Sequence, residues 1–126
     1  MINTAQALYR FWSGFGLKAF TIGTVPDEDE NGNLIVPPYI TYSLVESEPT
    51  EPVTGYAQLW YRDTGNAAIL AKVDEIKAAI GNGVVLPCDG GCVVLRPSTP
   101  FVQIMVDADP ANRYAYINLQ INCYHM

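Results

Sequence analysis

The part of the chain from Arg113 to Tyr124 alternates without a break between two kinds of residue. The small and apolar positions are Ala115, Ile117, Leu119, Ile121 and Cys123, and the others are Tyr114, Tyr116, Asn118, Gln120, Asn122 and Tyr124. Successive side chains of a strand point to opposite faces of a sheet, so this alternation predicts a half-buried strand. The second face is polar but uncharged, and aromatic residues with few Lys or Glu are typical of protein interfaces. The strand therefore indicates a part of an assembly more than a catalyst.

Periodicity and turn residues predict the other elements. Asn3–Phe15 should form a helix with a capping box of Asn3 and Gln6, and Thr64–Ile80 a second helix that ends at Gly81. The remaining expectations are an extended segment Lys18–Val25, a strand Tyr39–Glu46, a connector Glu46–Val53, a strand Tyr56–Arg62, a hairpin of Val84–Cys88 and Cys92–Arg96, and a strand Phe101–Asp107.

This order predicts an α+β fold in one domain, residues 1–126: a mainly antiparallel sheet with two helices packed on one face. The other face is then left to water or to a partner. Tyr56 and Trp60 alternate with apolar residues in their own strand. We predict an oligomer interface made of Tyr56, Trp60, Tyr114, Tyr116, Asn118 and Gln120.

The acidic excess of the chain lies in one stretch. No Lys or Arg occurs between Ala19 and Tyr61, whereas the run Asp27, Glu28, Asp29 and Glu30 falls in a loop that ends in a turn signal, Asn31-Gly32-Asn33. The sequence has no basic patch that could bind phosphates, which argues against direct binding of nucleic acid. The run could be a solvated loop tip, a calcium site without the usual ligand spacing, or a loop that directs an acidic field at a partner or a channel.

The residues suited to catalysis are few. The single histidine, His125, is the penultimate residue, and Cys88, Cys92 and Cys123 are poorly spaced for a zinc site with it. We expect no enzyme activity, no metal and no cofactor, with the cysteines acting as small apolar packing residues. No apolar run approaches ~18 residues and the first residues lack signal-peptide zones, so we expect no membrane segment and synthesis in the cytoplasm.

Several segments make the chain similar to a known family. They are Thr4-Ala5-Gln6-Ala7-Leu8-Tyr9, Pro37-Pro38-Tyr39-Ile40-Thr41-Tyr42, Ala57-Gln58-Leu59-Trp60-Tyr61-Arg62, the helix that follows, Arg96-Pro97-Ser98-Thr99-Pro100-Phe101, and the final strand. The chain resembles the tail terminator or head–tail joining proteins of long-tailed bacteriophages and prophages. The resemblance covers nearly the whole chain, through packing and strand patterns that contain no chemical signature.

The resemblance implies a structural protein of the virion, assembled in the bacterial host. Such proteins are α+β folds that form a ring, commonly of six copies, on the last ring of the tail tube. The ring stops tube growth and docks to the head connector, and DNA passes through its lumen without specific binding. Asp27, Glu28, Asp29 and Glu30 would then form a lumen or docking loop, because carboxylates repel DNA phosphates.

Three other functions stay open from the sequence. The chain could be a minor capsid or connector-completion adaptor at the head–tail interface, which would share the same fold. It could be an acidic DNA mimic that inhibits a nucleic-acid enzyme, although the Thr64–Ile80 helix balances Asp74 and Glu75 with Lys72 and Lys77. It could also be a small enzyme, although no residue set names a reaction.

Overall fold

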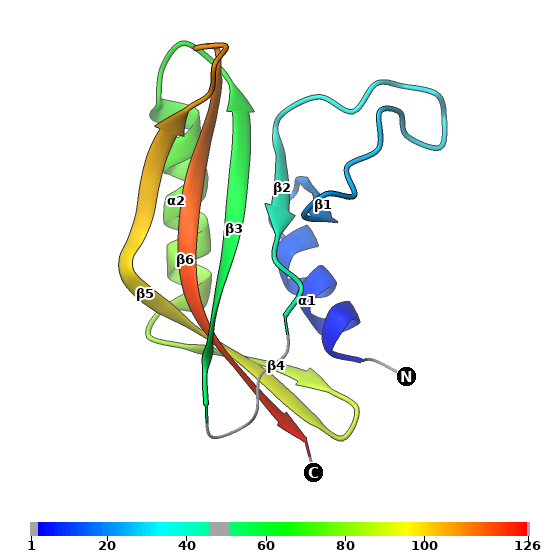
Figure 1. Cartoon of the computed structure of the whole chain (residues 1–126), viewed down its shortest axis with the longest axis vertical. Coiled ribbons are helices and arrows are strands. Elements are labelled where there is room, and N and C mark those ends of the chain that lie inside the picture. Colours follow the sequence, from blue (N-terminus) through cyan, green and yellow to red (C-terminus); the bar gives the residue numbers. More distant parts are fainter. Residues whose placement is uncertain (1–2, 46–50, 126) are drawn as a thin grey trace.

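The computed structural model describes residues 3–45 and 51–125 of the chain. The elements are α1 (Thr4–Ser13), β1 (Lys18–Thr21), β2 (Tyr39–Tyr42), β3 (Val53–Arg62), α2 (Ala67–Ile80), β4 (Val84–Cys88), β5 (Gly91–Val106) and β6 (Asn112–His125) (Figure 1). Of the predicted Glu46–Val53 connector, residues 46–50 lie outside the described residues, and β3 begins at its last residue.

The six strands form one mixed sheet in the order β1-β2-β3-β6-β5-β4. β1 and β2 are parallel, and the other four pairings are antiparallel. The two strands at opposite edges of the sheet, β1 and β4, both contact α1. Both edges can reach the same helix only if the sheet curls, so the sheet is a half-barrel whose concave side faces α1.

The predicted fold class, a mainly antiparallel sheet with two helices packed on one face, is therefore wrong. The sheet is mixed and curled, and α1 lies between its two edges instead of beside α2 on a flat face. The segment 22–38 causes the difference, because it is long enough to return the chain to the start of the sheet before β2 begins.

The concave side holds the hydrophobic core. α2 contacts β3, β5 and β6 through its buried stripe of Ile69, Val73, Ile76 and Ile80, and α1 contributes Leu8 and Trp12. The Trp12 indole packs against the Tyr42 ring of β2, with ring centroids 6.3 Å apart. The sheet contributes Ile40, Leu59, Leu95, Ala115, Ile117, Leu119 and Ile121, all fully or nearly fully buried. The small and apolar residues that occupy every second position of β6 thus point to the core, as predicted.

Local signals explain most of the element ends. The Asn3 side chain accepts the Gln6 backbone N–H at 2.9 Å, and the Gln6 side chain accepts the Asn3 N–H, which is the predicted capping box. Gly81 ends α2 with φ +56°. Among the described residues, no helix is long and apolar enough to cross a membrane.

Candidate interaction surface

The convex side of the sheet, here called the outer face, is not covered by either helix. Figure 1 looks onto this side, with β3, β5 and β6 in front of α2. The strand register places the outer-face residues in rows that run across the sheet. One row is Lys18, Tyr39, Trp60, Tyr114 and Met105, and the next is Phe20, Thr41, Gln58, Tyr116 and Gln103. Tyr56 and Asn118 stand opposite each other in the row that follows.

The aromatic side chains of the outer face pack against one another. The ring centroids of Trp60 and Tyr114 are 4.5 Å apart, and those of Tyr56 and Tyr116 are 5.0 Å apart in a stacked arrangement. Tyr39 continues the first row, 6.4 Å from Trp60 and 6.0 Å from Phe20. These contacts fix the ring orientations, and all six rings remain only half-buried.

Hydrogen bonds hold several amides of the face in place. The Trp60 indole N–H donates to the Thr41 hydroxyl at 3.3 Å, and that hydroxyl donates to the Gln58 side chain at 3.2 Å. Asn118 Nδ2 donates to the Pro100 carbonyl of β5 at 2.9 Å. By contrast, the hydroxyls of Tyr56, Tyr114 and Tyr116 make no hydrogen bond to any described residue, so they can bond to water or to a partner.

The structure brings all six predicted interface residues to the same face. Tyr56, Trp60, Tyr114, Tyr116 and Asn118 are half-buried there, and Gln120 is exposed. Sequence reasoning missed Phe20 and Tyr39, which extend the aromatic surface onto β1 and β2. Their rings meet diagonally between neighbouring rows, and this contact depends on the parallel β1–β2 pairing, which no local pattern indicates.

Charge is scarce on this surface. No Asp or Glu points outward from the strands, and the basic residues Lys18, Arg62 and Arg96 lie toward its margins. Burial raises the pKa of the Tyr116 phenol, with smaller contributions from the Tyr56 and Tyr114 phenols. The Tyr116 phenol therefore remains neutral at physiological pH, and the centre of the face has no acidic or basic side chain.

The predicted acidic loop forms an arm, residues 24–38, that extends away from the body of the molecule (Figure 1). Within it Asp29 has an internal role, because its Oδ1 accepts the backbone N–H groups of Asn31 and Asn33, both at 2.9 Å. These bonds, led by the one from Asn33, lower the pKa of the Asp29 carboxyl. Its Oδ2 also lies 3.4 Å from the Lys18 Nζ.

The other three acids of the run, Asp27, Glu28 and Glu30, are exposed. The arm also presents two large apolar side chains to solvent, Leu34 at 70% and Val36 at 62% exposure. Leu34 bridges Glu28 as in an antiparallel pair, and the Ile35 N–H donates to the Asp27 carbonyl at 2.9 Å. The arm is thus a folded hairpin with an acidic and apolar surface.

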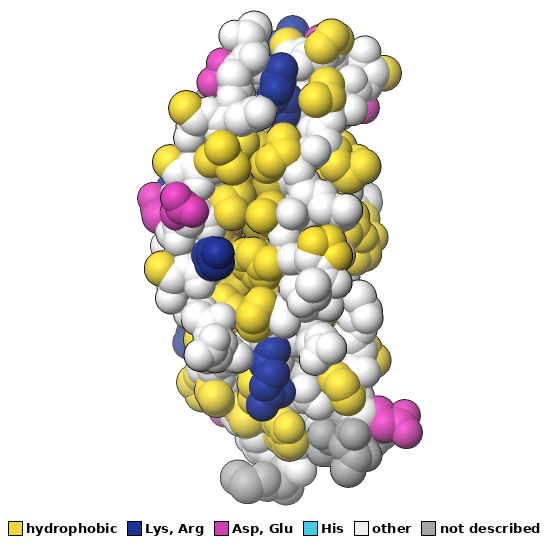
Figure 2. Space-filling view, turned by 90° about the vertical axis from the view of Figure 1, so that its left-hand side faces the viewer, with side chains coloured by type: hydrophobic (Ala, Val, Ile, Leu, Met, Phe, Trp, Pro, Cys, Tyr) yellow, Lys and Arg dark blue, Asp and Glu magenta, His cyan; other side chains and the backbone are white. Residues whose placement is uncertain are grey.

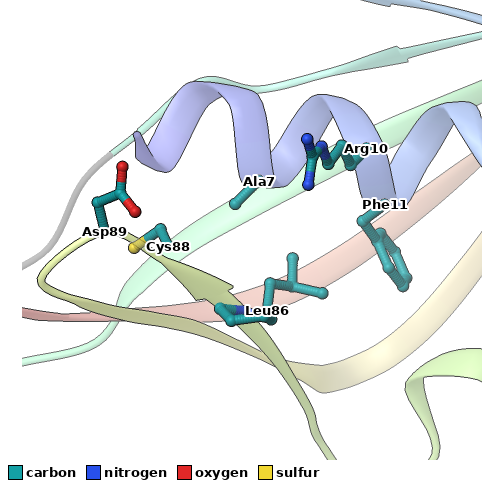
Figure 3. A pocket seen from close by; sticks show the side chains of 7 residues that line it. Ala7, Arg10, Phe11, Leu86, Cys88 and Asp89 are labelled. Atoms are coloured by element: carbon teal, nitrogen blue, oxygen red, sulfur yellow. The ribbon is translucent and has the colours of Figure 1, made fainter. Parts of the chain in front are cut away.

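A cavity of about 410 Å³ lies between α1 and the β4–β5 hairpin. Figure 3 shows Ala7, Arg10 and Phe11 approaching it from the helix, and Leu86, Cys88 and Asp89 from the hairpin. Arg10 makes no ion pair with a described residue. Desolvation raises the pKa of the Cys88 thiol, so little of the nucleophilic thiolate forms near neutral pH. The cavity lining combines apolar side chains with one cation, Arg10, one carboxylate, Asp89, and the Cys88 thiol.

The residues weighed for a metal site do not converge. Cys123 is buried in the core, Cys92 points to the outer face opposite Pro87, and His125 is exposed at the end of β6. Within residues 3–45 and 51–125, no three His, Cys, Asp or Glu side chains are grouped to hold a metal ion. Asp29, the best-held carboxylate of the acidic run, is already bonded within its own turn.

Comparison with protein-family models, with curated proteins and with solved structures finds no match to this chain.

Proposed function

We propose that this chain is a structural subunit of a bacteriophage virion that assembles as a ring, caps the tail tube and joins the tail to the head. The observation that supports it is the outer face, where Tyr56, Trp60, Tyr114 and Tyr116 form packed aromatic pairs that neither helix covers. Aromatic, weakly charged surfaces of this composition are typical of protein–protein contacts.

The face is also suited to binding with little loss of conformational freedom. The Trp60 ring is held by the Tyr114 ring and by the Thr41 hydroxyl, and the Tyr56 ring is held by the Tyr116 ring. Side chains that are already ordered lose less rotamer entropy when a partner binds. The free tyrosine hydroxyls add polar contacts that set the orientation of the partner.

The partners of this ring would be sister copies, the tail tube protein and the head connector. Phage DNA would pass through the lumen without specific binding, which suits a chain of net charge −6 whose acidic run Asp27–Glu30 lies in a protruding arm. In this function the chain supplies surfaces only, with no reaction and no cofactor.

Assembly in solution tests the proposal first. We expect sedimentation velocity and native mass spectrometry to show a closed ring that forms with rising protein concentration. We define the half-assembly concentration as the protein concentration at which half of the chains are in rings. Changing both Trp60 and Tyr114 to Ala should raise it at least about tenfold, as loss of hot-spot residues does. Tyr9, which is 52% exposed on α1, provides the matched control, and Tyr9→Ala should leave assembly unchanged. A wild-type protein that stays monomeric even with tail tubes present would refute the ring.

The position in the particle is tested by making phage without this protein. Overlong tails would support termination of the tube. Tails of normal length with unattached heads would instead favour the connector-completion adaptor, which uses the same kind of surface.

A further inference from the structure

β5 has an unprotected edge. β4 pairs with β5 only over Gly91–Leu95, whereas β6 pairs with it as far as Val106. In the part of the sheet that the structure describes, the rest of β5 therefore has a neighbour on one side alone. Its last six residues, Phe101–Val106, contain no charge and no proline. Soluble proteins usually protect such an edge with charges, proline or a covering segment, because it pairs readily with another chain.

An apolar groove runs beside this edge. Figure 2 shows hydrophobic side chains gathered in a hollow that follows the line between α2 and β5. Val102, Ile104 and Val106 lie on the helix side of β5, and Val106 is 53% exposed. Leu70 of α2 is 45% exposed and lies on the side of the helix opposite Lys72, whose Nζ donates to the Phe15 carbonyl after α1, so Leu70 faces away from α1.

Basic residues border the groove (Figure 2). Arg113 pairs with Val106, and its guanidinium donates to the Asp63 carbonyl and the Asn66 side chain. Arg96 projects from the outer face of β5, where it donates to the Asn122 amide oxygen, and its side chain lies beside Gly83, just beyond the end of α2. Lys77 is exposed on α2.

None of these three cations makes an ion pair with a described residue, whereas Lys18, Arg62 and Lys72 do. Acids also lie near this border: Asp74 is on α2 and Asp107 follows Val106, whereas the Asp63 carboxylate is bonded within its own turn and Glu75 is paired with Lys72. The groove is therefore apolar along its floor, and its border has three cations that no described acid pairs with.

The arm, residues 24–38, has the complementary surface. It presents Leu34 and Val36 on one side of an extended segment, and the run Asp27–Glu30 supplies its acids without any Lys or Arg. In Figure 1 the arm lies on one side of the molecule, and α2 and β5, which border the groove, lie on the other. The arm of one copy therefore cannot reach the groove of the same copy.

We propose that the arm of one copy docks in the α2–β5 groove of the next copy, with Leu34 and Val36 against the apolar floor and the acids toward the basic border. The inference rests on the proposed function, because it adds a second contact between neighbouring copies of the ring to that of the outer face. A contact between two different surfaces of identical subunits repeats head to tail and gives a ring when the rotation closes. The docked segment also covers the open edge of β5.

Disulfide trapping tests the contact directly. One sample contains Leu34→Cys protein, a second contains Leu70→Cys protein, and a third mixes the two under mild oxidation. Arm docking predicts an intermolecular disulfide in the mixture, mapped by mass spectrometry to positions 34 and 70. The two single-variant samples control for disulfides to Cys88, Cys92 and Cys123.

Assembly of charged variants gives the second readout. The Leu34→Asp/Val36→Asp variant and the Leu70→Asp variant should each raise the half-assembly concentration about tenfold or more, because buried apolar contacts are lost. Leu44→Asp is the matched control, since Leu44 is 50% exposed outside the arm and the groove. Circular dichroism confirms that each variant is folded.

The outcomes separate this inference from the proposed function. A ring that persists in the arm variants, with no 34–70 disulfide in the mixture, overturns arm docking and leaves the ring intact. A 34–70 disulfide in open chains without a ring supports the docking and refutes the closed ring. A wild-type protein that stays monomeric, together with no 34–70 disulfide in the mixture of the two Cys variants, overturns both.

Discussion

Trp60 of β3 and Tyr114 of β6 stand directly opposite each other in the antiparallel pairing, with ring centroids 4.5 Å apart on the side of the sheet that no helix covers. Cross-strand aromatic pairs of this kind stabilise a sheet as well as forming a surface. The pair therefore has two separable effects, one on the folding of the monomer and one on assembly.

The folding effect is measured by a double-mutant cycle of Trp60→Ala and Tyr114→Ala at a concentration below assembly. We expect a coupling free energy of about 0.5–1.5 kcal/mol in chemical denaturation, because the two rings are in contact. Trp60→Ala combined with Gln120→Ala is the control cycle, since Gln120 lies opposite Thr54, far along β3. Its coupling should be close to zero, and equal coupling in both cycles would argue against the Trp60–Tyr114 contact.

Gly91 tests the close approach of β5 to β6. It pairs with His125, and a Cβ placed on Gly91 would collide with the backbone carbonyl of Tyr124. The backbone cannot turn aside as a side chain could, so Gly91→Ala should reduce the free energy of unfolding by about 2–3 kcal/mol. Gly65→Ala is the matched control, because a Cβ there meets no atom and the change should cost less than about 0.5 kcal/mol. Equal free energies of unfolding for the Gly91→Ala and Gly65→Ala variants in urea would contradict the close approach of β5 to β6.

Short-range patterns made much of the fold predictable. The alternation of β6, the buried stripe of α2 and the Asn3–Gln6 capping box each depend on residues that are close in sequence. The start of α2 was predicted too early, at Thr64. The Asp63 carboxylate accepts the N–H groups of Thr64 and Gly65, and this turn delays the helix to Ala67.

The features that were not predicted depend on pairing between residues far apart in the sequence. The segment from Pro97 to Pro100 separated two predicted strands, yet β5 continues through it with a register shift between Pro97 and Val102. There the Asn118 side chain donates to the Pro100 carbonyl and replaces part of the ladder. The parallel return of β2 beside β1, and with it the curl of the sheet, depends on a contact that no local pattern encodes. The six predicted interface residues share one face because β3 and β6 happen to be neighbours.

Asp29 gives the arm a dependence on pH. The backbone N–H of Asn33, that of Asn31 and the Lys18 ammonium favour its carboxylate form, so its folded pKa lies below the unfolded value. A carboxyl of this kind stabilises the fold above its unfolded pKa, and that contribution disappears as the pH falls through the folded pKa. NMR titration should show the Asn31 and Asn33 amide resonances moving together with the Asp29 carboxyl resonance in acid. Asp29→Ala should shift both amides already at neutral pH, whereas Glu30→Ala, in the same turn, should not. Amides that titrate independently of Asp29 would contradict this turn.

The three cysteines should differ in reactivity toward iodoacetamide. Cys123 is fully buried in the core, so it should be alkylated only when the protein unfolds. Cys88 and Cys92 are half-buried and free, and burial raises the pKa of Cys88 above that of an exposed thiol. Because only the thiolate reacts, Cys88 should be alkylated more slowly than a small reference thiol near neutral pH. The difference between the two rates should become smaller as the pH rises. Peptide mapping by mass spectrometry separates the sites, and Cys88→Ser identifies its share of the label. If Cys123 of the folded protein were labelled as fast as Cys92, this would contradict the burial of β6 between β3 and β5.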